Sequence, residues 1–144
     1  VQDVMQEHIE RSGVVVECNP TSNVLIGTFG DYRKHPIFRF YDSGLGVGVD
    51  QQPCRQMEVC VNTDDLGIFD TSLEFEYALL FQALDEQLDA NGKKRYQTCD
   101  ILRYLKNLQD LGMRAVFPCC ESGAPREIRR GRSYGGLYQG PEYY

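Results

Sequence analysis

The sequence predicts an α/β fold, in which helices alternate with the strands of a parallel sheet. A β-branched run at residues 14–18 follows a helical pattern, a second extended segment lies at residues 57–62, and two long helical patterns come after it. The chain has 144 residues, of which 42% are apolar, so it is long enough to bury the core of one ordinary domain.

The first elements are expected to be a short amphipathic helix and a strand. Apolar side chains recur at a helical spacing over residues 1–11, and Ser12-Gly13 supplies a stop. Residues 14–18 are bounded by Gly13 and by Asn19-Pro20, which suits a strand buried on both faces. Residues 19–34 are rich in turn formers and are expected to form a loop.

The middle of the chain is expected to hold a second helix and two extended segments. His35-Pro36 opens this helix, because proline suits the first helical turn, and the helix should end near Ser43-Gly44. Residues 45–50 and 57–62 form either a hairpin or a loop followed by one strand of the sheet. Residues 63–70 are expected to be a polar loop.

Two longer helices are predicted in the second half of the chain. A cap at residues 71–72 begins the first of them, which runs to about Leu88. The second begins at residues 98–100 and has Gly112 as its C-cap. The predicted apolar face of this last helix consists of Ile101, Leu102, Leu105, Leu108 and Leu111.

Helical and strand periodicity ends near Pro118, so we expect one domain over residues 1–118 and a tail over residues 119–144. Four arginines fall within Arg126 to Arg132, and tyrosines and glycines follow them. A solvated extension explains this composition. The alternative is a tail that contacts nucleic acid or a protein partner.

Charge and hydropathy indicate a soluble protein. The formal net charge of -6 argues against general phosphate-backbone binding, which draws its affinity from a basic surface, so nucleic acid is not an expected partner. No apolar run is long enough to span a membrane, and the first residues lack the basic and apolar regions of a signal peptide. We therefore expect no membrane partner and a cytoplasmic location. The six cysteines lack C-x-x-C spacing and are expected to be free thiols.

Two loops carry the residues that point to chemistry. The first is Cys18-Asn19-Pro20-Thr21-Ser22-Asn23, and the second runs from Asn62 through Asp64 and Asp65 to Phe69. Each leaves the carboxyl end of a predicted strand, and in parallel α/β folds ligands and catalytic groups collect at that edge. An Asp-Asp pair in a turn also commonly serves as a helix cap, and loop-bracing explains Asn19, Ser22 and Asn23 equally well.

These motifs resemble the adenosine and AMP deaminase branch of the metal-dependent amidohydrolases. In that family a C-P-x-S-N type sequence, a helix opening at His-Pro and a T-D-D-P segment occur in the same order as residues 18–23, 35–36 and 62–69 here. The sequence at residues 74–77 also resembles the helix that follows. The resemblance implies that residues 1–118 form the C-terminal portion of a metal-dependent hydrolase (β/α)8 TIM barrel, which is incomplete in this chain.

The resemblance also assigns roles to individual residues. It implies that Asp64 is a Zn²⁺ ligand and a catalytic residue that contacts the zinc-bound water. Asp65 would be catalytic and would bind the purine ring, beside Ser22 and Asn23 as substrate-binding residues. The implied reaction converts adenosine or an adenine nucleotide to its inosine form. His8 and His35 are expected to be surface or structural residues.

The family pattern also requires an H-x-H pair, a further zinc histidine, a catalytic glutamate and an H-G histidine, and none is found in this chain. The segment is therefore expected to be inactive without the remaining part of the barrel, supplied by an upstream segment or a separate chain. Exposed barrel edges also favour association, including a homo-oligomer. The alternative is a catalytically dead, deaminase-derived structural or assembly module. Leu66 departs from the family proline, and residues 48–57 look like an insertion.

Overall fold

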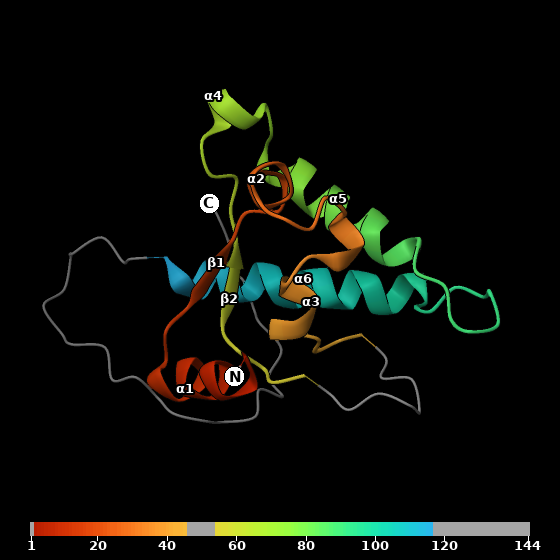
Figure 1. The fold of residues 1–144 in the computed structure, drawn as a ribbon, viewed down its shortest axis with the longest axis horizontal. Helices are drawn as coiled ribbons and strands as arrows, with labels where there is room; N and C mark the ends of the chain where they lie inside the picture. Colours follow the sequence, from red (N-terminus) through yellow and green to blue (C-terminus); the bar gives the residue numbers. More distant parts are fainter. Residues whose placement is uncertain (1, 46–53, 117–144) are drawn as a thin grey trace, which may run out of the picture.

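The computed structural model describes residues 2–45 and 54–116. Two short strands cross the centre of this part of the chain and helices surround them, with α6 passing behind both strands (Figure 1). The elements, in chain order, are α1 (Gln2–Ser12), β1 (Val16–Cys18), α2 (Pro20–Ile26), the 3-10 helix η1 (Tyr32–Lys34), α3 (Ile37–Phe40), β2 (Val59–Val61), α4 (Leu66–Phe69), α5 (Leu73–Asp85) and α6 (Thr98–Ala115).

The strands β1 and β2 pair in parallel, so that Val16 lies opposite Val59 and Cys18 opposite Val61. The sheet is open and contains two strands in the described part of the chain. Burial of the first strand on both faces was a wrong expectation, because Glu17 is exposed while Cys18 is buried. Alternate side chains of a strand point to opposite faces, so β1 buries one face only.

The core lies between the sheet and the helices α5 and α6. The buried face of α6 consists of Ile101, Tyr104, Leu108 and Leu111, a spacing that keeps them on one side of a helix. Leu102 was predicted on this face, but its side chain is 55% exposed because it points sideways from that stripe. Gly112 was predicted to end the helix and instead lies inside it, since α6 continues to Ala115.

The predicted loop over residues 19–34 contains the helix α2 and the turn η1, which the composition did not indicate. Pro20 occupies the first turn of α2, where proline's fixed φ and missing N–H are tolerated. The side chain of Asn19 makes no cap hydrogen bond there, and a distant carboxylate on α5, from Glu76, accepts from the Thr21 N–H instead. Tertiary contacts therefore support a helix that turn-forming residues alone would not predict.

The other boundaries differ from expectation at their ends. The helix predicted from His35 is the four-residue α3, and α4 lies within the predicted polar loop. Ser72 caps α5 as predicted, accepting a hydrogen bond from the Phe75 N–H at 3.2 Å, and α5 ends at Asp85 rather than Leu88.

Gly44 allows the chain to pass close to α6. Its φ of +103° lies in the left-handed region, and a Cβ added there would stand 2.9 Å from the Tyr104 backbone nitrogen. Any larger residue would therefore meet both backbone strain and a steric clash. This glycine fixes the loop before the second strand against the buried side of α6.

The described cysteines Cys18, Cys54, Cys60 and Cys99 are free thiols, as predicted. Cys119, Cys120, the predicted tail over residues 119–144 and most of the predicted segment at residues 45–50 lie outside the described residues. Over the ranges that the structure covers, no helix combines the length and apolar character needed to cross a membrane.

Candidate active site

The carboxyl ends of β1 and β2 meet at one edge of the sheet, because the two strands are parallel and in register. The backbone there continues the pairing, since the Asn62 N–H donates to the Cys18 carbonyl oxygen at 3.0 Å. Helices α2 and α4 lie at this same end of the strands, opposite α1 (Figure 1). The two loops that sequence analysis selected are therefore neighbours in space.

A side-chain hydrogen bond joins these two loops directly. The Ser22 hydroxyl donates to Asp64 Oδ2 at 2.8 Å. Ser22 is 1% exposed, whereas Asp64 is exposed. The serine hydrogen-bonds one carboxylate oxygen from the buried side, and the other oxygen, Oδ1, makes no hydrogen bond with the residues that the structure describes, so that it can receive an incoming group. Both residues are among the predicted site residues, and the structure brings them together.

The backbone of Asp64 has a φ of +59°, in the left-handed region that non-glycine residues seldom adopt. Aspartate tolerates this conformation better than most residues, but strained dihedrals persist where the surrounding structure determines them, often at functional sites. The left-handed turn and the bond from Ser22 together fix the direction of this carboxylate.

One carboxylate oxygen of Asp65 has a structural role. Its Oδ1 accepts hydrogen bonds from the Gly67 N–H at 2.9 Å and the Ile68 N–H at 3.0 Å, so that it is the N-cap of α4. Leu66 then occupies the first helical position, where proline is favoured in general. The departure from the family's T-D-D-P segment is therefore compatible with the same backbone, and Asp65 retains one carboxylate oxygen that no hydrogen bond of the described residues uses.

Asn23 braces the first loop rather than facing Asp64. Its Oδ1 accepts from the Asn19 N–H at 3.1 Å and lies 3.1 Å from His35 Nε2. His35 Nδ1 accepts from the Ile37 N–H, which can only donate, so the proton of the neutral ring is on Nε2 and is donated to Asn23. Burial lowers the pKa of His35 to about 4, which keeps the ring neutral at physiological pH.

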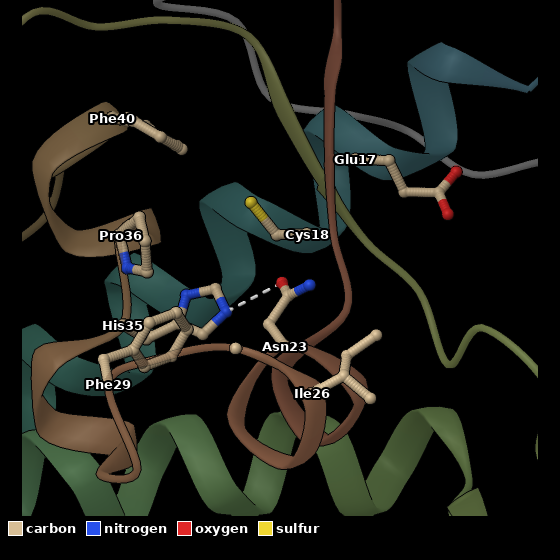
Figure 2. Close-up of a pocket in the computed structure, with 9 residues that line it drawn as sticks. Glu17, Cys18, Asn23, Ile26, Phe29, His35, Pro36 and Phe40 are labelled. Carbon is tan, nitrogen blue, oxygen red and sulfur yellow. Dashed lines mark hydrogen bonds between the residues drawn. The ribbon is translucent and has the colours of Figure 1, made fainter. Parts of the chain in front are cut away.

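A pocket of about 270 Å³ lies beside this brace. Figure 2 shows His35 and Asn23 joined at its centre, with Cys18 and Phe29 beside them. Phe29 meets the His35 ring edge-on, with 5.5 Å between ring centroids. His35 was expected to be surface or structural, and the structure assigns it the structural role, while His8 lies on the surface.

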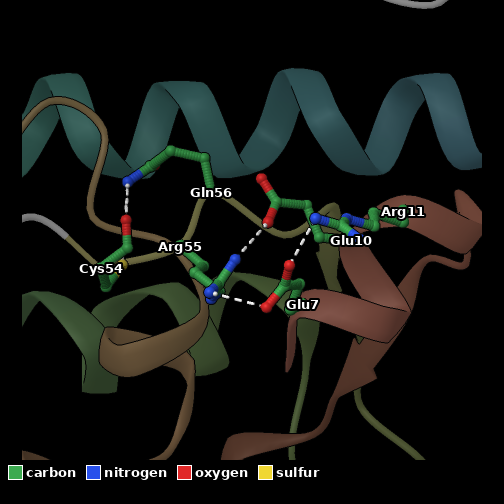
Figure 3. A network of polar contacts seen from close by, with 6 residues as sticks. All are labelled: Glu7, Glu10, Arg11, Cys54, Arg55 and Gln56. Carbon is green, nitrogen blue, oxygen red and sulfur yellow. Dashed lines mark hydrogen bonds and ion pairs between the residues drawn. The ribbon is translucent and has the colours of Figure 1, made fainter. Parts of the chain in front are cut away.

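A second polar cluster lies at the opposite end of the sheet and is a structural clamp. Arg55, in the segment before β2, reaches Glu7 at 3.2 Å and Glu10 at 3.4 Å on α1 (Figure 3). Arg11 pairs with Glu7 as well. These groups are solvent-accessible ion pairs whose contribution to stability is small, about 0–1 kcal/mol each. They join α1 to the segment before β2 and lie away from the strand ends that carry Asp64.

A zinc ion would find one ligand here and not a whole site. Asp64 Oδ1 is a hard carboxylate oxygen of the kind that zinc accepts. Catalytic zinc sites normally use three or more protein ligands. In the part of the chain that the structure describes, no three His, Cys, Asp or Glu side chains come together as a metal-binding group. The residues present fit a single ligand position.

Comparison with known proteins points in the same direction. The chain is 36% identical to adenine deaminase of Rhizobium meliloti over 84 residues, which cover 56% of this chain and 22% of that protein. It is 33% identical to adenosine deaminase of Plasmodium gallinaceum over 81 residues, or 56% of this chain and 19% of that protein. A match to adenine deaminase of Rhizobium leguminosarum, at 32% identity, covers 62% of this chain and 26% of the relative.

No protein-family profile matches the chain, and no solved structure matches it either. The chain spans about a fifth to a quarter of the length of the curated relatives it matches. Because all three of these relatives are deaminases, the chain contains a partial deaminase-like region. More particularly, this region is similar to the adenosine and adenine deaminases, which confirms the resemblance inferred from the motifs.

Proposed function

We propose that this chain supplies the C-terminal strands and helices of a (β/α)8 barrel in a zinc-dependent hydrolytic deaminase. The observation that carries the proposal is the bond from Ser22 to Asp64, which joins two strand-end loops in a chain similar to adenine and adenosine deaminases. Some of these relatives are named adenine deaminase and others adenosine deaminase, which supports adenine and adenosine as candidate substrates beside the adenine nucleotides. In the overall reaction, water replaces the amino group of the adenine ring and ammonia leaves.

Asp64 is the metal-binding residue in this proposal. Its Oδ1 would be available to bind zinc, while Oδ2 accepts the hydrogen bond from the Ser22 hydroxyl. When bound, zinc supplies Lewis-acid chemistry that makes water nucleophilic near neutral pH. Ser22, which is buried, acts by holding Asp64 and does not itself reach the substrate. The burial of Ser22 and its hydrogen bond to Asp64 favour a role in holding that carboxylate over the direct substrate contact that was predicted.

Asp65 is the substrate-orienting residue. Its Oδ1 is occupied by the N–H groups of α4, which fixes the side chain and leaves Oδ2 to form a hydrogen bond with the purine. Asn23 contributes by fixing the first loop to His35. Preorganised groups of this kind gain catalytic effect because they need no reordering when the reaction occurs.

The remaining zinc ligands come from the rest of the barrel, on an upstream segment or a separate chain. The first measurement is a peptide map by mass spectrometry of the purified protein with everything that accompanies it. We expect an H-x-H segment and a histidine in an H-G setting. Intact-mass measurement under native conditions should then detect one zinc ion per assembly, and adenine and adenosine are assayed by ammonia release.

The decisive variant is Asp64→Ala in the complete assembly, with Asp70→Ala as its matched control. Asp70 is also an exposed aspartate with a positive φ, +46°, on the same segment, so both variants remove a carboxylate and disturb a left-handed turn. We expect Asp64→Ala to abolish deamination and Asp70→Ala to retain most of it. Full activity of Asp64→Ala would refute the assignment.

A second candidate function is a catalytically dead assembly module, and exposed apolar side chains favour it. Leu25 and Ile26 on α2 and Leu66 and Ile68 on α4 are each more than half exposed near the strand ends. Single exposed apolar residues are common, but a group of them suits coverage by another segment or a second copy. A complete assembly that forms normally, lacks the histidine motifs and shows no deamination for any adenine compound would establish this function instead.

A further inference from the structure

Glu76, on α5, is a buried carboxylate that the roles assigned above do not use. Its side chain is 0% exposed. Oε2 accepts a hydrogen bond from the Thr21 N–H at 2.9 Å, and Oε1 accepts one from the Thr71 hydroxyl at 2.6 Å. Both oxygens are therefore paired inside the protein, as a buried carboxyl group requires.

The partners of Glu76 belong to the two segments that form the candidate site. Thr21 lies in the loop and helix that follow β1, and Thr71 lies in the segment that follows β2 and α4. Ser22, the next residue after Thr21, donates to Asp64 at 2.8 Å. The first turn of α2 is thus held at two adjacent residues, by Glu76 through the backbone and by Asp64 through a side chain.

This contact replaces a local cap. The first N–H groups of a helix have no partner within the helix, and the residue before α2, Asn19, makes no side-chain cap hydrogen bond. Thr21 is buried, so its N–H depends on Glu76. A side chain 55 residues away in the sequence therefore sets the position of the turn that carries Ser22.

We propose that Glu76 is a positioning residue of the active site, which fixes Thr21 and through it the direction in which Ser22 holds Asp64. This role rests on the proposed deaminase function only for its effect on rate, because the positioning itself can be measured without activity. Glu76 acts through Ser22 and touches neither substrate nor metal. It orients the carboxylate that the reaction requires.

The test compares Glu76→Leu and Glu76→Gln with the control Glu74→Gln. Glu74 is an exposed glutamate in the same first turn of α5, so the control keeps the helix and the residue type while leaving the buried contact intact. A glutamine at position 76 can still accept from Thr21 with its oxygen and donate to the Thr71 hydroxyl with its amide. Leucine can do neither.

Hydrogen exchange and amide chemical shifts in the folded chain provide the first readout. We expect Glu76→Leu to raise the exchange rate of the Thr21 amide by about tenfold to a hundredfold, whereas Glu76→Gln and Glu74→Gln leave it nearly unchanged. Glu76→Leu should also shift the Asp64 amide resonance in the same direction as Ser22→Ala. An unchanged exchange rate of the Thr21 amide, or an Asp64 amide resonance that does not shift in Glu76→Leu, overturns the proposal.

Steady-state kinetics of the complete assembly provide the second readout. We expect Glu76→Leu to lower kcat by about tenfold to a hundredfold with little change in KM, and Glu76→Gln to restore most of it. In a Ser22→Ala background, Glu76→Leu should lower kcat little further, because both substitutions act on the carboxylate of Asp64. Additive losses would refute positioning through Ser22. If the unmodified assembly deaminates nothing, the proposed function fails while the exchange readout still decides the role of Glu76.

Discussion

Acidification should destabilise the fold through one buried histidine, His35. Its Nδ1 must stay unprotonated to accept the Ile37 N–H, and burial lowers the pKa of the folded form from 6.5 to about 4. The unfolded chain therefore takes up a proton first as the pH falls. The difference corresponds to about 3 kcal/mol, lost between pH 6.5 and about 4 and fully present above pH 6.5.

The assay follows the imidazole resonances of a His8→Gln variant by NMR, since the chain has two histidines and this variant leaves only His35. Chemical denaturation of the same variant is measured between pH 7 and about 5, a window above the range in which ordinary carboxylates titrate. We expect the free energy of unfolding to fall there, and His35→Gln to remove this slope. A His35 resonance that titrates near its ordinary pKa while the chain is folded would refute the reasoning.

Two further predictions concern the core and the thiols. Leu108→Ala should lower the free energy of unfolding by about 2–5 kcal/mol, because Leu108 is 0% exposed. Leu102→Ala, on the solvent side of α6, should change it by about 0.5 kcal/mol or less. Equal urea midpoints for the two variants would contradict this packing. Brief alkylation at neutral pH followed by peptide mapping should label exposed Cys99 before Cys18, since burial raises the pKa of Cys18 to about 12; early labelling of Cys18 would show that β1 opens readily.

The sequence predicts those elements whose signals are local. The β-branched run before Cys18 indicates a strand, the apolar stripe of α6 indicates a long helix, and the Ser72 cap marks the start of α5. The proximity of the loops that carry Ser22 and Asp64 also follows from the sequence, because the ends of parallel strands share an edge and both loops follow such ends. The hydrogen bond between the two side chains was not predicted.

Distant contacts explain what sequence analysis missed. Helix α2 forms where turn-forming residues predict a loop, because Glu76 accepts from the Thr21 N–H. Gly112 indicates a helix end, yet α6 continues through it beside Cys60, 4.0 Å from where a Cβ would stand. The sequence pattern does not show which group a buried side chain will hydrogen-bond, as with His35 and Asn23. A glutamate at an otherwise apolar helical position was the available clue to Glu76.

The left-handed backbone of Asp64 imposes a separate constraint on how this position can vary over evolution. At a φ of +59°, glycine, asparagine and aspartate are the residues that the main chain accepts at low cost. Of these three, aspartate alone carries a charge. When homologous sequences are aligned, an aspartate that is retained here and not replaced by asparagine or glycine therefore indicates that the charge is needed as well as the turn. Exchange among aspartate, asparagine and glycine would mark lineages in which only the shape of the turn is still under selection.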